Sequence, residues 1–270
     1  MKQAIGVIDS GVGGLTVVHE LMRQLPNEKL IYLGDTLRCP YGSRTAEEIK
    51  QFTWEMVDFL LSKNIKMLVI ACNTATAYTL EELKEKLNIP VIGVIQPGAR
   101  AAIKVTQNNQ VGVIGTEGTI QSRAYEQALK KVKADIQVYS LACPLLVPMV
   151  EKGVLLGRGA DRVVEQSLQP IKAQKSIDTL ILGCTHYPLI KQPIQDFIGP
   201  DVAIISSSEE TAREVSAILD IYHLFNKDEK PPIHAFYTTG QLSIFKNITN
   251  RIFNHPIHHL QRVTIEKTTI

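Results

Sequence analysis

Short runs of Val, Ile and Leu alternate along the chain with amphipathic segments of helical period. The runs predict ten strands, at 4–8, 29–34, 66–71, 89–94, 110–115, 135–140, 178–183, 202–205, 233–238 and 259–265. Short buried strands that alternate with helices are typical of parallel sheets in an α/β fold. We therefore expect an α/β protein with mainly parallel sheets.

Two of the intervening segments begin with helix-start signals. Thr45-Ala46-Glu47-Glu48 is a capping-box signature, and the apolar residues that follow it share one helical face: Ile49, Phe52, Met56 and Leu60. Ser207-Ser208-Glu209-Glu210 is predicted to open another helix in the same way. These signals place helices between the predicted strands.

One order of residue types, an apolar run followed by a cysteine motif and a helix start, occurs twice in the sequence. Ala71-Cys72-Asn73-Thr74 and Gly183-Cys184-Thr185-His186 each follow an apolar run and precede a helix start, the second marked by Pro188. The cysteines are 184 − 72 = 112 positions apart, and the strand-end residues Asp9 and Thr116 upstream of them are 116 − 9 = 107 apart. We interpret this as a diverged internal duplication that gives two similar halves.

Polar residues follow several of the predicted strands directly. They are Asp9, Asp35, Cys72, Thr116 and Cys184. Ligands of open α/β sheets gather outside the carboxyl ends of the strands. The sequence therefore predicts a cleft shared by these residues.

The length of 270 residues allows two domains, at about 150 residues each. The clearest breaks between possible domains lie at Pro97-Gly98 and around 206–208. We therefore expect one domain from 1–97 plus 207–270, with the chain leaving and returning, and a second domain from 98–206.

Composition is that of a globular protein, with 44% apolar and 21% charged residues. The net charge of +2 does not favour nucleic acid or a membrane as a partner. The apolar run before Asp9 is too short for a signal peptide, and no run of 18 apolar residues occurs, so we expect a cytoplasmic protein. Cysteines 39, 72, 143 and 184 lack C-x-x-C spacing, which argues against zinc and disulfides.

The paired cysteines suggest a reaction at a stereocentre. A helix N-terminus behind Cys72 is expected to lower its thiol pKa toward neutrality. Thiols on both faces of a carbon could remove a proton from one face and deliver one to the other. A cysteine hydrolase would leave the second thiol unused. The alternative is that both cysteines are buried packing residues.

Three motifs resemble those of the glutamate racemase family, within the cofactor-independent aspartate/glutamate racemases. They are Asp9-Ser10-Gly11-Val12-Gly13-Gly14-Leu15-Thr16, Ala71-Cys72-Asn73-Thr74 and Gly183-Cys184-Thr185-His186-Tyr187-Pro188. The resemblance spans nearly the whole chain. It implies two pseudosymmetric α/β domains, a homodimer, and 1,1-proton transfer on glutamate without pyridoxal phosphate or metal. The product would be D-glutamate for peptidoglycan.

Matching positions carry the family's residue roles onto this chain. Cys72 and Cys184 would be the proton donor and acceptor, assisted by Asp9 and His186. The substrate would be held by Asp9, Ser10, Tyr41, Gly42, Asn73, Thr74, Thr185 and His186. The family's other polar cleft residues match Asp35, Thr119 and Glu151.

The residues themselves leave alternatives open. Asp9 could cap the helix after Gly13-Gly14, His186 could be a partly buried loop residue, and Glu151 could be a solvated helix-end carboxylate. The function could also be racemisation of aspartate or another small amino acid. A third alternative is a two-lobed amino-acid-binding protein without catalysis.

Overall fold

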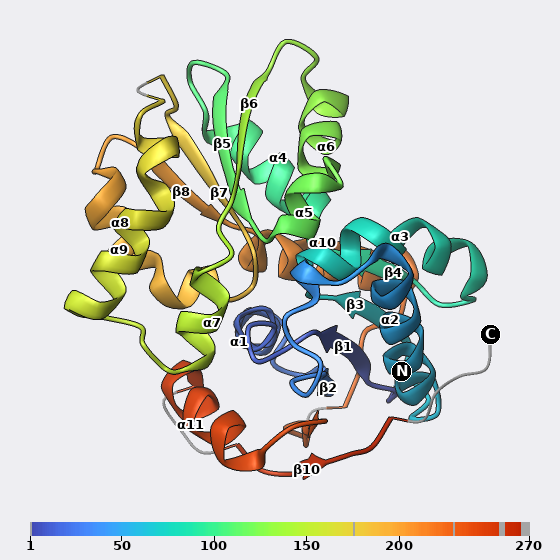
Figure 1. The fold of residues 1–270 in the computed structure, drawn as a ribbon. Helices are drawn as coiled ribbons and strands as arrows, with labels where there is room; N and C mark the ends of the chain where they lie inside the picture. The colour runs from blue at the N-terminus through green and yellow to red at the C-terminus, as the bar shows by residue number, and fades with distance from the viewer. Residues whose placement is uncertain (1, 175, 229, 254–256, 266–270) are drawn as a thin grey trace.

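The computed structural model describes residues 2–174, 176–228, 230–253 and 257–265, and contains two parallel sheets. The first has the order β10-β9-β2-β1-β3-β4. Its strands are β1 (Ile5–Asp9), β2 (Leu30–Gly34), β3 (Met67–Ile70), β4 (Val91–Gly93), β9 (Ala235–Thr238) and β10 (Leu260–Arg262). Every pairing in this sheet is parallel, and it forms the lower half of the molecule in Figure 1.

The second sheet has the order β6-β5-β7-β8 and forms the upper half in Figure 1. Its strands are β5 (Gln110–Gly115), β6 (Gln137–Ala142), β7 (Thr179–Gly183) and β8 (Ala203–Ser206). The order β2-β1-β3-β4 in the first sheet matches β6-β5-β7-β8 in the second. The equivalent central strands β3 and β7 are those that precede Cys72 and Cys184, as the predicted duplication requires.

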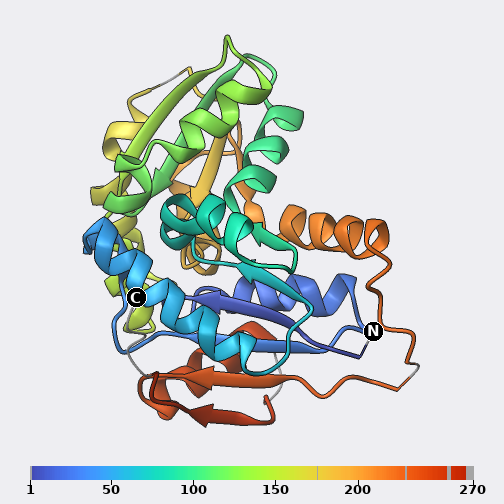
Figure 2. The ribbon, with the colours of Figure 1, turned by 90° about the vertical axis from the view of Figure 1, so that its right-hand side faces the viewer.

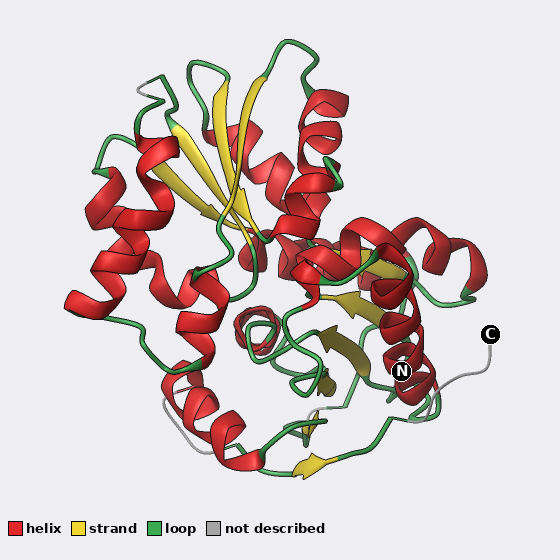
Figure 3. Cartoon of the chain, in the orientation of Figure 1, coloured by secondary structure: helices red, strands yellow, loops and turns green. Residues whose placement is uncertain are grey.

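Helices cover both faces of each sheet, as the secondary-structure view in Figure 3 shows. The first sheet lies between α1 (Leu15–Gln24), α10 (Ser207–Ile221) and α11 (Leu242–Phe253) on one side and α2 (Ala46–Leu61) and α3 (Asn73–Lys86) on the other. On the second sheet, one side is covered by α4 (Ile95–Val105) and α6 (Ala124–Val132). The other side is covered by α7 (Leu146–Glu151), α8 (Arg158–Lys172) and α9 (Lys191–Ile198). The short helix α5 (Glu117–Gln121) and the 3-10 helices η1 (Tyr41–Ser43) and η2 (Tyr187–Ile190) complete the set within the described residues.

The central strands are buried on both faces, which explains their unbroken apolar sequence. Every residue of β1, β3 and β7 is buried, whereas the edge strand β6 is partly exposed. All ten predicted strands are present, although β10 ends three residues earlier than expected. The predicted α/β class with parallel sheets is confirmed.

Two helices are predicted to begin at capping signals. The capping box at Thr45 is confirmed, because its hydroxyl accepts from the Glu48 N–H and the Glu48 carboxylate accepts from the Thr45 N–H. At α10, however, the cap is Ser206, which accepts from the Ser208 N–H. The predicted Ser207 box is therefore wrong by one residue, because β8 continues to Ser206 and the helix follows without a loop.

The chain crosses between the two sheets near the middle of the molecule, where α10 lies beside α4 and α1 (Figure 2). Pro97 and Gly98, interpreted from the sequence as a break, lie in the first turn of α4. Proline is tolerated there because the first turn of a helix has no partner for its N–H groups.

Candidate active site

The carboxyl ends of β1, β3, β5 and β7 meet around one cavity. Its lining contains residues of both halves: Ser10, Pro40, Tyr41, Gly42, Cys72, Asn73, Thr74, Thr116, Val147, Cys184, Thr185 and His186. Both duplicated cysteines are in this lining, one after each equivalent strand. The cavity has a volume of about 10 Å³ open to water, which is roughly the space of one water molecule.

Cys72 is the N-cap of α3, as its place between a strand and a helix predicts. Its Sγ accepts from the Ala75 N–H at 3.4 Å and donates to Ser10 Oγ at 3.5 Å. Burial raises the pKa of the Cys72 thiol to about 12, and the nearby Asp9 carboxylate adds to the effect. The prediction that the helix N-terminus brings this pKa toward neutrality is therefore wrong, because desolvation outweighs the N–H group.

Cys184 lies at one end of a chain of polar groups. Its Sγ is 3.7 Å from His186 Nδ1, and His186 Nε2 is 2.6 Å from Glu151 Oε1. Burial opposes a charged imidazole. The Cys184 and Cys39 thiols and the Glu151 carboxylate, which surround the ring, nevertheless raise the pKa of His186 well above 6.5. Burial likewise opposes the charge on Glu151, yet His186 lowers the pKa of that carboxyl. The arrangement thus favours an imidazolium beside a carboxylate.

Asn73 offers a hydrogen-bond donor in the cavity wall. The Tyr125 hydroxyl of α6 donates to Asn73 Oδ1 at 2.7 Å, so the amide orientation is fixed by a residue of the other half. The buried Nδ2 has no hydrogen-bond partner among the described residues. A buried donor without a partner is costly, and a carboxylate in the cavity would satisfy it.

Three threonines join the halves at one side of the cavity, two of them in its lining. Thr74 Oγ1 is 2.8 Å from Thr116 Oγ1 and 3.0 Å from Thr119 Oγ1, and the last two are 3.0 Å apart. A Cβ at Gly42 would lie 2.3 Å from the Thr116 Cβ, so only glycine permits this approach. These contacts bring the 40–42 segment of the first half against the second.

Two aspartates predicted for the site lie behind the lining. Asp9 is fully buried and accepts from the Thr185 hydroxyl at 3.1 Å and the Gly11 N–H at 3.0 Å. Burial raises the pKa of Asp9, although His186 opposes this rise. Asp35 accepts from the Tyr41 hydroxyl at 2.6 Å and from Arg38 Nε at 2.5 Å. Asp35 therefore holds a lining residue in place.

The structure thus brings most of the predicted residues together. Nine of them line the cavity directly: Ser10, Tyr41, Gly42, Cys72, Asn73, Thr74, Cys184, Thr185 and His186. Asp9, Asp35, Thr119 and Glu151 do not line it but contact residues that do.

Sequence reasoning missed Pro40 and Val147, which line the cavity, and Tyr125, which orients Asn73. Val147 and Tyr125 carry no local signal, because apolar and aromatic residues on helices by default pack in a core. Pro40 adjoins the matched pair Tyr41-Gly42 and could have been found from that position.

Other pockets are larger. One of them, between α3, β4 and α10, is lined mainly by aliphatic, amide and lysine side chains. We assign the site to the smaller cavity because the perturbed titratable groups cluster there. Among the described residues, no helix is both long and apolar enough to cross a membrane.

Comparison with known proteins agrees with this geometry. The Asp/Glu/hydantoin racemase family model matches residues 5–215. A glutamate racemase of Oceanobacillus iheyensis is 67% identical over 270 residues, covering 100% of this chain and 98% of the relative.

Two solved structures are also similar. The structure of a glutamate racemase isoform from Bacillus anthracis has a TM-score of 0.91 and 50% identity, over 98% of this chain and 99% of that one. The Francisella tularensis glutamate racemase in complex with D-glutamate has a TM-score of 0.91 and 37% identity, over 99% of both chains. With matches of this extent, the chain belongs to the glutamate racemases of the Asp/Glu/hydantoin racemase family.

Proposed function

We propose that this protein interconverts L- and D-glutamate, with Cys72 and Cys184 exchanging the proton at Cα. One observation carries the proposal: two thiols, each after the equivalent strand of its own sheet, line one cavity. A binding protein would have no need of a second thiol at the same place. The family membership independently favours a racemase.

The chemistry needs one thiolate and one thiol. The thiolate takes the Cα proton from one face and becomes a thiol, which leaves a carbanion at Cα. The second thiol then gives its proton to the opposite face and becomes a thiolate. Configuration is inverted, and the two cysteines exchange protonation states, so the reverse reaction uses the same groups.

Substrate charge would prepare this reaction. The α-carboxylate would accept from Asn73 Nδ2 and from backbone N–H groups at the start of α3, where a helix favours anions. Ser10, Thr74 and Thr185 would supply further hydrogen bonds. The α-ammonium would lie toward Asp9, and its positive charge would favour a thiolate at Cys72, opposing the effect of burial.

His186 would serve the other thiol. Its Nδ1 faces Cys184 Sγ, and Glu151 supports its charged form, so it would stabilise a thiolate at Cys184 or pass a proton to it. Thr119, Tyr41, Gly42 and Asp35 would shape the cavity rather than take part in proton transfer.

Glutamate is the substrate that the comparisons favour. The relatives are named glutamate racemases, and the Francisella tularensis structure contains D-glutamate. D-glutamate for peptidoglycan would be the product used by the cell. Aspartate is the alternative to be tested alongside it.

Exchange of hydrogen isotope tests the reaction. The chelator-treated protein is incubated with L-glutamate in D₂O, and the product is separated and analysed by mass spectrometry. We expect D-glutamate that carries deuterium at Cα, and a much slower reaction with L-aspartate. Absence of both D-glutamate and Cα exchange would refute the proposal.

Single substitutions test the two-thiol scheme. We expect Cys72→Ser and Cys184→Ser each to abolish racemisation in both directions, because a hydroxyl is a far weaker acid than a thiol. Cys143→Ser is the control, since that buried thiol lies outside the cavity lining and its hydrogen bonds go to backbone carbonyls. Full activity of both single variants would show that the thiols are not the acid and base.

The closed cavity implies movement. Glutamate is larger than the space of one water molecule, so the lining must separate to admit it. We propose that the moving bodies are 1–97 plus 207–270 and 98–206, which hold the six-stranded and four-stranded sheets. Small-angle scattering with and without glutamate would test whether the radius of gyration falls on binding.

We further propose that the chain works as a homodimer in the cytoplasm. The motif resemblance supports the dimer, and four free cysteines, three of them buried, suit a reducing compartment. Sedimentation velocity would measure the oligomeric state, with and without substrate.

A further inference from the structure

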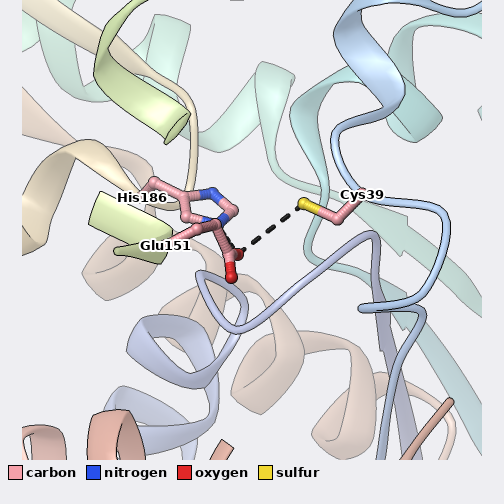
Figure 4. A group of neighbouring side chains, drawn as sticks. All are labelled: Cys39, Glu151 and His186. Carbon is pink, nitrogen blue, oxygen red and sulfur yellow. Dashed lines mark hydrogen bonds and ion pairs between the residues drawn. The ribbon is translucent and has the colours of Figure 1, made fainter. Parts of the chain in front are cut away.

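A third thiol lies beside the polar chain that leads to Cys184. Cys39 Sγ is 3.6 Å from Glu151 Oε1, the same oxygen that lies 2.6 Å from His186 Nε2 (Figure 4). All three ligand atoms lie within 4.8 Å of one another. The proton-transfer scheme uses Cys72 and Cys184 and gives Cys39 no task.

The geometry of the three atoms is close to that of a transition-metal site. Bond lengths of about 2.3 Å for Zn–S and about 2.0 Å for Zn–O give a tetrahedral S···O edge of about 3.5 Å. The observed Cys39–Glu151 separation is 3.6 Å. The His186–Glu151 separation of 2.6 Å needs to widen by about 0.6 Å, which a small rotation of the Glu151 carboxylate supplies.

Gly11 lies close against these three atoms. A Cβ at Gly11 would lie 2.7 Å from Glu151 Oε1, 2.9 Å from Cys39 Sγ and 3.2 Å from His186 Nε2. A side chain at this position would therefore collide with the ligand atoms. Glycine allows Cys39, Glu151 and His186 to approach one another here.

The three side chains come from different parts of the fold. Cys39 lies between β2 and η1 in the first half, Glu151 ends α7 and His186 precedes η2 in the second. In Figure 4 the Cys39 sulfur points across to the Glu151 carboxylate from the opposite side. An ion held by all three would link the two halves next to the cavity.

We propose that Cys39, Glu151 and His186 bind a divalent ion of the zinc class, and that this ion inhibits the enzyme. Thiolate, imidazole and carboxylate together suit Zn²⁺ rather than Mg²⁺ or Ca²⁺, which prefer oxygen ligands alone. The site was not expected from the sequence, because residues 39, 151 and 186 have no metal-binding spacing.

Inhibition follows from two effects and rests on the proposed function. Coordination of His186 Nε2 replaces its 2.6 Å contact with Glu151 by a bond to the ion, which displaces the ring whose Nδ1 faces Cys184. The link between the halves also opposes the separation that admits glutamate. Cys184 itself is no ligand, because it faces Nδ1 on the other side of the ring.

Cobalt binding tests the site without reference to catalysis. Chelator-treated protein is titrated with Co²⁺, which replaces zinc and gives a near-ultraviolet thiolate band and visible bands of tetrahedral intensity. We expect both bands in the wild type, and in Cys72→Ser, Cys184→Ser and Cys143→Ser. We expect their loss in Cys39→Ser and in Cys39→Ala, whose folding is checked by circular dichroism.

The outcomes separate the possibilities. Bands that persist without Cys39, or that vanish without Cys72 or Cys184, would place the metal on the catalytic thiols and overturn the assignment. No thiolate band in the wild type would also overturn it. These results are readable even if the protein failed to racemise glutamate, so the two proposals can fail independently.

Zinc inhibition completes the test. Racemisation by the wild type is measured against free Zn²⁺ held by a metal buffer, and excess chelator is then added. We expect reversible inhibition, with Cys39→Ser at least about tenfold less sensitive. Equal sensitivity of Cys39→Ser and the wild type would refute the inhibitory role.

Discussion

At the scale of single residues, burial decides the chemistry of Cys72. The thiol has a helix N-terminus and a hydroxyl beside it, both of which favour a thiolate, yet its pKa rises to about 12. A Cys72 thiol that stays uncharged until substrate binds avoids the free-energy cost of an isolated buried charge. Ionisation would then accompany the binding of a positively charged ammonium.

The Tyr125 hydroxyl gives a prediction at this scale. Tyr125→Phe removes the bond to Asn73 Oδ1 while keeping the ring packed, so Asn73 is free to turn its amide. Loss of one hydrogen bond, about 1 kcal/mol, should raise KM for glutamate about fivefold. Because carboxylate binding is common to ground and transition states, kcat should change less, and initial-rate kinetics measure the split.

Tyr139→Phe is the matched control for that experiment. Its hydroxyl donates to Gln110 Oε1 between β6 and β5, and neither residue lines the cavity. An unchanged KM in Tyr125→Phe, or an equal rise in Tyr139→Phe, would show that Tyr125 does not orient the substrate-binding amide.

At the scale of elements, hydrogen bonds to Asp178 connect the turn between α4 and β5 to the start of β7. Its carboxylate accepts from Thr106 Oγ1 and the Gln107 N–H, both at 2.7 Å, from the Asn108 N–H at 2.9 Å and from Thr179 Oγ1 at 2.9 Å. Partial burial raises the pKa of this carboxyl, but the hydrogen bonds outweigh burial and lower it below 3.8.

Asp178→Asn should therefore destabilise the protein in a pH-dependent way. The amide turns an NH₂ group toward donors, which should cost about 1–3 kcal/mol at neutral pH. Folding lowers the pKa of the Asp178 carboxyl, so the carboxylate stabilises the folded protein at pH values above its pKa in the unfolded chain. This stabilisation is lost as the pH falls through its pKa in the folded protein. Urea unfolding of both proteins should show a difference that shrinks below pH 3.8. A difference independent of pH would contradict the role of the charge.

At the scale of the whole molecule, a buried ion pair holds the returning chain against the first sheet. Lys66 Nζ is 2.6 Å from Glu28 Oε2 and donates to the Leu224 carbonyl at 2.7 Å. The Asn226 N–H donates to Glu28 Oε1 at 2.7 Å. The segment between α10 and β9, which brings the chain back from the second half, is thus tied to residues before β2 and β3.

Glu28→Gln should weaken this connection strongly. It leaves the Lys66 charge buried without its carboxylate, at a cost of about 3–5 kcal/mol in the free energy of unfolding. The control is Glu20→Gln, which breaks a more exposed pair with Arg23 and should cost less than about 1 kcal/mol. Chemical denaturation compares the two, and equal losses would show that burial of the pair is unimportant.

The sequence by itself determined the ten strands, the α/β class and the equivalence of Cys72 and Cys184. Each depends on residues close together in the chain: apolar runs of strand length, capping signals and repeated motifs. It also indicated most lining residues, since the ends of parallel strands meet at one edge of a sheet.

Only the tertiary structure decided the rest. It placed β9 beside β2 and β10 beside β9, put Asp35 behind Tyr41, and brought Tyr125 to Asn73 and Cys39 to Glu151. It also reversed the expected shift of the Cys72 pKa. The reason is physical: strand pairing, desolvation and hydrogen bonding between distant segments depend on what the folded chain brings together, and no local pattern records that.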